Sequence, residues 1–388
     1  MHILFVTHAY PRWDGDVAGA FIERLAVALG ERGHAVSVVA PSDAGKGGHD
    51  ARHGIPVNRV RYAAPRRETL AYRGTMVDAV GSLGGKLAAG RLMFAMARAV
   101  RRAARAGRVD LVHAHWWVPG GVSAWLASMD RGPAYVVTLH GTDVAVLERS
   151  GIARALARRV LQGAAAVTAV SSFLAERAAA VAGLDAEAML VQPMPADLVR
   201  LSRPSAGGGG VITVGRLVAQ KRVDLLLEAV ARLKEQGKAV PLTVVGDGPL
   251  RGALEEHAER LGITATTRFV GEVKPQDLAR AIGDADVFAF PAVGEGLGLA
   301  AAEALILGIP VVATRSGGGV TDIVPTEGAG RLVDAGDAGA MAHAIGELLD
   351  NPAARSLATS LGAALRERFD PQRVAQRFDS LYDRLVYA

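Results

Sequence analysis

Short apolar runs recur along the first half of the chain and alternate with longer stretches in which apolar residues return every three or four positions. The runs occupy residues 2–7, 35–40, 111–115, 135–140 and 166–170. Continuous apolar strands that alternate with amphipathic helices are typical of a parallel sheet covered on both faces. The pattern therefore predicts an α/β domain of the doubly wound type.

The same alternation restarts after a glycine-rich segment. Residues 201–210 read LSRPSAGGGG, a stretch without periodicity that predicts a flexible linker. Further apolar runs follow at 211–215, 242–246, 267–271, 286–291 and 309–314. The sequence thus predicts two Rossmann-like doubly wound domains facing across a cleft, where the carboxyl ends of such strands bind ligands.

The domain boundaries follow from these patterns. We assign residues 1–200 to an N-terminal domain, 201–210 to the linker and 211–370 to a C-terminal domain. Residues 371–388 predict a last helix, and we expect it to pack back toward the N-terminal domain. Its apolar stripe consists of Val374, Phe378, Leu381 and Leu385.

Length and composition agree with a globular protein of two domains. The chain has 388 residues, more than a single hydrophobic core usually serves, and only 21% of them are charged. No apolar run approaches the roughly 18 to 20 residues that span a bilayer. Because the N-terminus lacks a basic leader, we expect a cytoplasmic protein. The absence of cysteine excludes disulfides, thiolate metal sites and cysteine nucleophiles.

Positive charge is concentrated in the N-terminal half. Residues 1–200 hold 24 Lys and Arg against 16 Asp and Glu. Within them, residues 90–108 place Leu92, Met93, Met96 and Val100 beside five arginines from Arg91 to Arg105. Such a helix either lies on an anionic membrane, which would make the protein peripheral on the inner face, or packs its apolar side on its own sheet. The excess charge also favours a phosphate-bearing or lipid-linked acceptor, and we expect no nucleic-acid partner. The alternative is that the arginines simply solvate helices.

A candidate anion site follows the first strand of the C-terminal domain. The strand ends at Gly215, Arg216 and Lys221 lie in the loop, and a helix begins near Val223. Two cations beside a helix N-terminus favour an anionic ligand. The alternative is a solvated surface turn.

Two carboxylates stand out in the apolar segment EGLGLAAAEALILGIP. Glu295 lies in a glycine-bearing turn and Glu303 in the following helix, eight positions later. A buried carboxylate costs several kcal/mol unless it is paired. Glu295 and the free amides of the turn suit a polar ligand, and Glu303 suits a vicinal diol such as ribose. Alternatively, Glu303 bonds a neighbouring loop and Glu295 serves as a helix-start carboxylate.

Two further patterns resemble metal sites, and we predict that no metal is required. Asp284 and Asp286 are separated by one residue but lead directly into an apolar strand. His113 and His115 share one face of a strand without a third candidate ligand nearby.

Eight ordered segments carry a resemblance to a known family. They are YPRWDGDVAGAF (10–21), HAHWWVPGG (113–121), TLHGTD (138–143), AVSSFL (169–174), GRLVAQK (215–221), VVGDGPLR (244–251), FVGEV (269–273) and EGLGLAAAEAL (295–305). Together they resemble the retaining, nucleotide-sugar-dependent glycosyltransferases of the GT-B fold, of the family 4-like and group 1 types. Polysaccharide biosynthesis is a common setting for such enzymes.

The resemblance implies that the N-terminal domain binds the acceptor and that the C-terminal domain binds the nucleotide-sugar donor. It also implies roles for individual residues. It assigns Gly215, Arg216 and Lys221 to the donor diphosphate, Glu303 to the ribose and His140 to the donor sugar. The segment from Phe269 to Val273 would lie near the base, and the loop from Asp16 to Gly19 would lie near the diphosphate and acceptor. The sugar would be held by Glu295 and by the backbone of Gly296, Leu297, Gly298 and Leu299.

The implied reaction moves a hexosyl unit from a UDP-, GDP- or ADP-sugar to a hydroxyl of a glycan, glycolipid or small molecule. Retention would come from same-face attack, and no cofactor beyond the nucleotide sugar would be required. A sugar-nucleotide epimerase and a catalytically idle binding module on the same fold are the alternatives. The segment Gln192–Asp197 departs from the family pattern, in which an Asn-Gly pair often precedes the aspartate.

Overall fold

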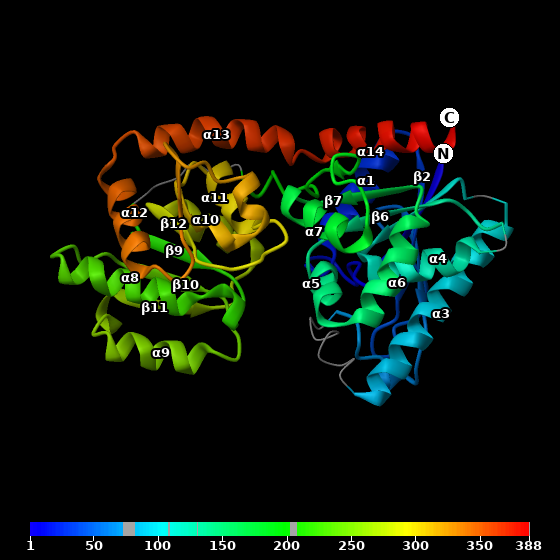
Figure 1. Ribbon diagram of the computed structural model, residues 1–388, viewed down its shortest axis with the longest axis horizontal. Helices are drawn as coiled ribbons and strands as arrows, with labels where there is room; N and C mark the ends of the chain where they lie inside the picture. The colour runs from blue at the N-terminus through cyan, green and yellow to red at the C-terminus, as the bar shows by residue number, and fades with distance from the viewer. Residues whose placement is uncertain (73–81, 108, 130, 202–207, 388) are drawn as a thin grey trace. The chain divides into compact units, whose positions relative to one another are not determined.

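The computed structural model describes residues 1–72, 82–107, 109–129, 131–201 and 208–387. These residues form two compact units, one made of 1–196 with 369–388 and the other of 197–368. Each unit is built on one mainly parallel sheet with helices packed against it (Figure 1). The predicted class of two doubly wound α/β domains is confirmed.

The first unit contains an eight-stranded sheet in the order β3-β4-β2-β1-β5-β6-β7-β8. Only the β3–β4 pair is antiparallel. The strands are β1 (His2–Val6), β2 (Ala35–Pro41), β3 (Gly48–Arg52), β4 (Ile55–Val60), β5 (Leu111–His115), β6 (Tyr135–Leu139), β7 (Ala166–Ala169) and β8 (Leu190–Val191).

The apolar pattern missed three of these strands for physical reasons. Strand β3 reads GHDAR and is largely exposed, so an apolar run does not mark it. Strand β4 alternates buried and polar positions and contains a proline, and β8 has only two residues. All three lie at or next to the edges of the sheet.

The helical segments of the first unit include the C-terminal helix. They are α1 (Ala20–Glu31), η1 (Pro65–Arg67), α3 (Leu83–Arg105), η2 (Trp116–Gly121), α4 (Val122–Ser128), α5 (Thr142–Arg149), α6 (Gly151–Gln162), α7 (Ser172–Ala182) and α14 (Pro371–Val386). Helix α14 packs against α1, and Asp379 on it pairs with Arg32 at 2.7 Å and with His34 at 2.8 Å. No helix in the described part of the chain is long and apolar enough to cross a bilayer.

The second unit contains a fully parallel sheet of six strands in the order β11-β10-β9-β12-β13-β14. The chain leaves β9 toward one edge and returns to the other side of β9 at β12, so the strand order reverses between β9 and β12. The strands are β9 (Val211–Val214), β10 (Leu242–Val245), β11 (Thr267–Gly271), β12 (Val287–Phe290), β13 (Val311–Thr314) and β14 (Gly330–Val333).

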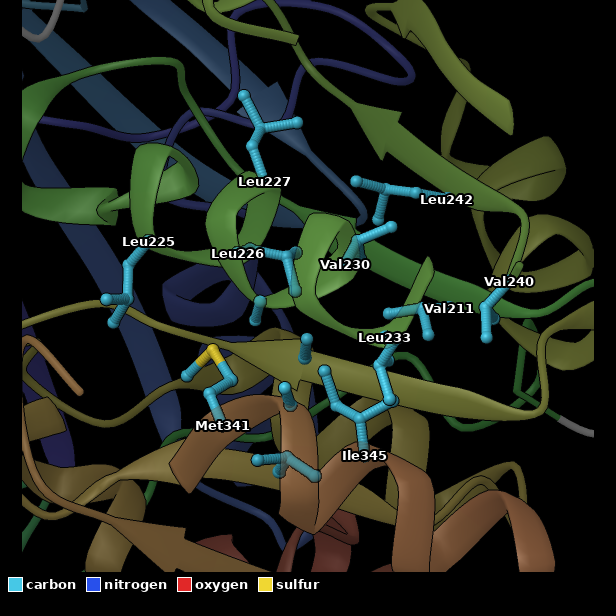
Figure 2. Close-up of a cluster of buried hydrophobic side chains, with 14 of the residues drawn as sticks. Val211, Leu225, Leu226, Leu227, Val230, Leu233, Val240, Leu242, Met341 and Ile345 are labelled. Atoms are coloured by element: carbon cyan, nitrogen blue, oxygen red, sulfur yellow. The ribbon is translucent and has the colours of Figure 1, made fainter. Parts of the chain in front are cut away.

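Apolar packing makes this sheet a rigid support. Leu226 and Val230 of α8 gather with Met341 and Ile345 of α12 in one buried cluster (Figure 2). Burying each such side chain stabilises the fold by about 1.5–3 kcal/mol. The helices are α8 (Val223–Glu235), α9 (Arg251–Arg260), α10 (Pro275–Asp284), α11 (Leu299–Ile306), α12 (Ala338–Asp350) and α13 (Ala354–Arg368), with short helical turns η3 (Ala219–Lys221), η4 (Thr264–Thr266), η5 (Arg315–Gly317) and η6 (Gly319–Asp322).

The division between the units falls at 196/197, before the boundary that we assigned at residue 200. Ala196 donates its backbone N–H to the Phe369 carbonyl at 3.1 Å, which ties it to the start of the C-terminal segment. Residues 202–207, at the centre of the predicted linker, lie outside the described residues.

Candidate active site

The loop after β9 is held close to the loop after β10. Gly215 donates its N–H to the Val245 carbonyl at 3.0 Å. A Cβ on Gly246 would lie 2.0 Å from the Gly215 carbonyl oxygen, so this approach requires glycine. The chain then passes Arg216, whose side chain is exposed, and reaches Lys221 just before α8.

Lys221 forms an ion pair with Glu295, the first of the two carboxylates. Its Nζ lies 2.9 Å from Glu295 Oε1, and both side chains are 21% exposed. Nζ also lies 5.4 Å from the centre of the Phe290 ring. Lys221 follows β9 and Glu295 follows β12, the two strands between which the strand order reverses. Ligands of open α/β sheets bind at such a switch point.

The backbone on both sides of Glu295 is fixed by hydrogen bonds. Glu295 donates its N–H to Gly317 at 2.9 Å and accepts from Gly319 at 3.0 Å, while Val293 donates to Gln220 at 3.0 Å. At Gly318, φ is +85° and a Cβ would lie 2.1 Å from the Glu295 carbonyl oxygen. Glu295 is therefore presented from a rigid turn.

Helix α11 begins immediately after this turn. Gly298 precedes the helix in a left-handed conformation with φ of 84°, and no side chain caps its first amides. The first amides of a helix lack partners within the helix and attract anions or polar groups. Of the predicted sugar-binding positions, Leu297 is buried at 6% exposure, and Leu299 is 40% exposed.

Glu303, on α11, is paired with a residue that the sequence did not indicate. Its Oε1 accepts from the guanidinium of Arg200, and both side chains are mostly buried, at 16% and 14% exposure. Arg200 lies 103 positions earlier in the chain, so no local pattern could have revealed the pair. Pairing explains how a carboxylate persists in this apolar helix.

The segment predicted to lie near the base is the end of β11 and the loop that follows. The Phe269 side chain packs against the buried cluster of the second unit, and Val273 is half-buried. Arg251 donates to the Phe269 carbonyl at 3.3 Å and pairs with Asp247 at 3.0 Å.

In the first unit, His140 follows β6 and is fixed by a buried carboxylate. Asp143 is 3% exposed, and its Oδ1 accepts from the amides of His140 at 3.2 Å and Gly141 at 2.9 Å. Its other oxygen accepts from the Trp117 amide at 3.1 Å. Burial raises the pKa of Asp143, while these backbone hydrogen bonds act in the opposite direction. Asp143, the last residue of the HGTD motif, therefore fixes the backbone of His140, the first residue of the motif.

His140 also contacts His115. The distance from His115 Nδ1 to His140 Nε2 is 3.2 Å, and His115 Nε2 is buried without a partner. Burial lowers the pKa of both rings well below 6.5, so both are neutral at pH 7. A buried unpaired acceptor costs less than a buried unpaired N–H. In the favoured arrangement, Nδ1 of His115 carries a proton and donates it to Nε2 of His140. The proton of His140 then lies on Nδ1 of the His140 ring.

The loop before α1 is a compact turn. Gly19 has φ of +74°, and a Cβ there would lie 2.1 Å from the Ala9 carbonyl oxygen. Asp16, 9% exposed, accepts from Arg12 Nε at 2.7 Å and from the Ala18 amide at 3.2 Å. This loop follows β1, which neighbours β5 where the strand order of the first sheet reverses.

Two supposed metal patterns have structural explanations. Asp286 holds the start of β12 by accepting from the amides of Gly208 at 2.8 Å and Gly210 at 2.9 Å. His113 forms two hydrogen bonds of 2.6 Å, one from Nδ1 to the Tyr382 hydroxyl and one from Nε2 to the Thr138 hydroxyl. Within the described ranges, no group of three His, Asp or Glu could hold a metal ion.

Comparisons with known proteins agree with this architecture. Residues 207–368 match the family model described as glycosyl transferases group 1, and residues 18–195 match the glycosyl transferase 4-like domain. The fold is similar to that of sucrose-phosphate synthase from Thermosynechococcus elongatus, with a TM-score of 0.78 and 22% identity over 99% of this chain and 98% of that one.

Two curated relatives are similar in sequence. GDP-mannose-dependent alpha-(1-6)-phosphatidylinositol monomannoside mannosyltransferase of Mycobacterium tuberculosis is 28% identical over 99% of this chain and 97% of the relative. The 2-deoxystreptamine glucosyltransferase of Streptomyces kanamyceticus is 30% identical over 63% of this chain and 69% of the relative. The chain belongs to the nucleotide-sugar glycosyltransferases of the GT-B fold.

Proposed function

We propose that the protein transfers a hexosyl unit, with retention of configuration, from a nucleoside-diphosphate sugar to a hydroxyl of a glycan, glycolipid or small molecule. The observation that carries this proposal is the Lys221–Glu295 pair at the switch point of the second sheet, beside the uncapped start of α11. The combination offers to one ligand a cation, a carboxylate and first-turn amides that no side chain caps.

In the proposed donor complex, Arg216 and Lys221 hold the diphosphate, and Gly215 lets it approach the backbone. Breaking the bond from the anomeric carbon to the diphosphate leaves negative charge on the departing group. Fixed cations therefore stabilise the transition state more than the ground state. Because the Lys221–Glu295 pair is partly exposed, a diphosphate can replace Glu295 as the partner of Lys221, and Glu295 still reaches water.

We propose the remaining donor contacts from the family resemblance. Glu303, held by Arg200, receives the ribose hydroxyls. Glu295 and the backbone of residues 296–299 hold the sugar, and residues 269–273 lie near the base. We assign to the neutral His140 a hydrogen bond from Nδ1 to the donor sugar. The Gly19 loop is assigned to the diphosphate and acceptor.

For retention we propose same-face attack, in which the leaving phosphate oxygen takes the proton of the acceptor hydroxyl. The two carboxylates of this site are ion-paired with Lys221 and Arg200, which favours a binding role over a role as nucleophile. The protein's own cations supply the charge that stabilises the leaving group, so we propose that transfer proceeds without a metal ion.

The decisive experiment incubates the protein with labelled UDP-, GDP- and ADP-sugars and a panel of acceptors. Transfer releases nucleoside diphosphate and attaches the sugar to the acceptor. With retention, an α-linked donor gives an α-linked product. An epimerase would leave the nucleotide attached to an altered sugar, and a binding module would do neither. A thermal-shift series with UDP, GDP and ADP identifies the base, because a ligand that binds the folded state raises its stability.

A further inference from the structure

Trp116 is a bulky residue held in an unfavourable backbone conformation just after β5. Its φ is +63°, in the left-handed region that large side chains rarely adopt. Strained residues of this kind persist only where the surrounding structure holds them, and they concentrate at functional sites. Because Trp116 directly follows His115, the strain lies beside the histidine pair of the candidate site.

Contacts on the C-terminal side hold this strained conformation in place. Trp117, 1% exposed, donates its amide to Asp143 Oδ2 at 3.1 Å and its indole Nε1 to the Asp143 carbonyl at 2.7 Å. A Cβ on Gly120 would lie 2.5 Å from the His115 carbonyl oxygen, so the chain turns back closely on the end of β5. Asp143 also accepts from the His140 amide at 3.2 Å. One carboxylate therefore fixes the backbone at both Trp117 and His140.

The indole of Trp116 is the common member of a cluster of four rings. Its centroid lies 4.4 Å from that of His140 and 4.2 Å from that of His8. Phe21, at the start of α1, contacts both Trp116 and His140, with centroids 6.0 Å and 5.3 Å away respectively. Trp116 is only 8% exposed, whereas the other three rings are partly exposed. Trp116 therefore supports rings that reach the surface and does not itself offer a surface to a ligand.

The contacts of His140 restrict both the rotation and the protonation of its ring. An unrestrained imidazole can turn about its bond to Cβ, which exchanges the places of its two nitrogens, and it can carry its proton on either nitrogen. His115 Nδ1 meets His140 Nε2 at 3.2 Å, and the indole of Trp116 packs against the ring with the two planes inclined by 36°. The hydrogen bond selects the nitrogen, and the packed indole opposes the rotation.

We propose that Trp116 is a positioning residue of the transferase, which together with His115 holds the His140 ring in the one orientation that directs Nδ1–H at the donor sugar. This inference rests on the proposed function, because it uses the sugar contact assigned to His140. Packed neighbours have to hold a catalytic group within about 0.5 Å of its productive position. The alternative is that Trp116 only fills the core, but a tryptophan that only fills the core needs no left-handed backbone.

The first test is ¹⁵N NMR of the ligand-free protein labelled at its ten histidines, which reads the tautomer of His140 without any substrate. The His140→Gln spectrum assigns the signals by their disappearance. We expect a single tautomer with the proton on Nδ1 in the parent protein and in Trp116→Phe, which keeps an aromatic ring. Trp116→Met keeps a large side chain and the same backbone strain but loses the ring, so both tautomers of His140 should appear.

The second test measures turnover of the donor by the same variants. Trp116→Met should lower kcat at least about tenfold while the donor KM changes by less than about threefold, because orientation is lost and binding is largely kept. Trp116→Phe should stay within about threefold of the parent protein in both constants.

Trp125→Leu is the matched packing control. Trp125 Cδ1 lies 3.5 Å from the position of a Cβ on Gly163, which precedes β7. His140 follows β6, which is parallel to β7, so Trp125 packs at the opposite end of the sheet. This variant should leave kcat and the tautomer of His140 unchanged.

Two results would overturn the proposal. One is a parent spectrum in which the His140 proton lies on Nε2 or is shared between both nitrogens, and this result decides the matter even if Trp116→Met does not fold. The other is Trp116→Met with the tautomer of the parent protein or with kcat within about threefold of it. If the parent protein transfers no sugar, the proposed function fails, and the spectra alone still decide whether Trp116 fixes the ring.

Discussion

Replacing Lys221 with alanine should strongly lower kcat while the protein still folds. In the ligand-free protein, the substitution removes one partly exposed ion pair and a cation–π contact. Exposed ion pairs contribute about 0–1 kcal/mol, and an exposed cation–π contact contributes about 0.5–1 kcal/mol. Because both side chains are only 21% exposed, the substitution also leaves Glu295 unpaired, and the free energy of unfolding should fall by about 1–3 kcal/mol.

The effect on the transition state should be larger. Two unit charges about 4 Å apart interact by roughly 4 kcal/mol at an effective dielectric constant of 20. Because charge on the diphosphate grows as the bond breaks, a large part of this interaction appears only in the transition state. Removal of one preorganised group of this kind typically costs about 10²–10³ in kcat. We expect Lys221→Ala to lower kcat by at least about 100-fold.

The assay measures release of nucleoside diphosphate under saturating donor, together with urea unfolding of each variant. Lys238→Ala is the matched control, because Lys238 also pairs with a carboxylate of the second unit, Asp350, away from the site. Glu295→Ala should lower kcat by a similar factor, and the double variant should lose less than the product of both effects because the residues are in contact. If kcat of Lys221→Ala stays within about threefold of the control, the role of this cation in leaving-group stabilisation is wrong.

Three further predictions test binding, packing and pH dependence. Glu303→Ala should raise the donor Kd about tenfold or more with a smaller change in kcat, and calorimetry that finds an unchanged Kd would contradict the ribose contact. Gly19→Ala should lower the free energy of unfolding by about 3 kcal/mol or more, because its backbone has φ of +74° and the added Cβ would lie 2.1 Å from the Ala9 carbonyl oxygen. Gly84→Ala is the control and should not lower the free energy of unfolding, because a Cβ at Gly84 would meet nothing within 4 Å. Burial lowers the pKa of His113 to about 3 from 6.5, so the folded state keeps it neutral while the unfolded chain takes up a proton below pH 6.5. His113 therefore contributes stability that is fully present well above pH 6.5. As the pH falls to about 5.5, the free energy of unfolding should decrease by about 1.4 kcal/mol because of this group. Urea unfolding at several pH values should give a shallower decline for His113→Gln, and an equal decline would refute the assignment.

The pattern of apolar runs was sufficient for the central strands of both sheets, because these strands are buried on both faces and contain few polar residues. Strand β12, for example, reads VFAF and is buried at every position. The edge strand β3 escaped detection because its exposed residues GHDAR carry no apolar signal. Burial thus determines which strands a single sequence can reveal.

The candidate site also contains residues that the sequence indicated and residues that it did not. Lys221 and Glu295 stood out in the sequence because each follows a strand at a glycine-bearing turn. Arg200 and His115 did not stand out as site residues, since their contacts with Glu303 and His140 join segments distant in the chain. A local motif contains no information about a partner that only folding brings near.

For this protein, the sequence by itself determined the α/β class, the presence of two units and the loops that carry the candidate chemistry, because strand burial and turn geometry depend on neighbouring residues. Only the tertiary structure decided which charges are paired, which histidines are neutral and which face of α3 is buried. These properties depend on distances between segments and on removal from water, and a linear pattern records neither.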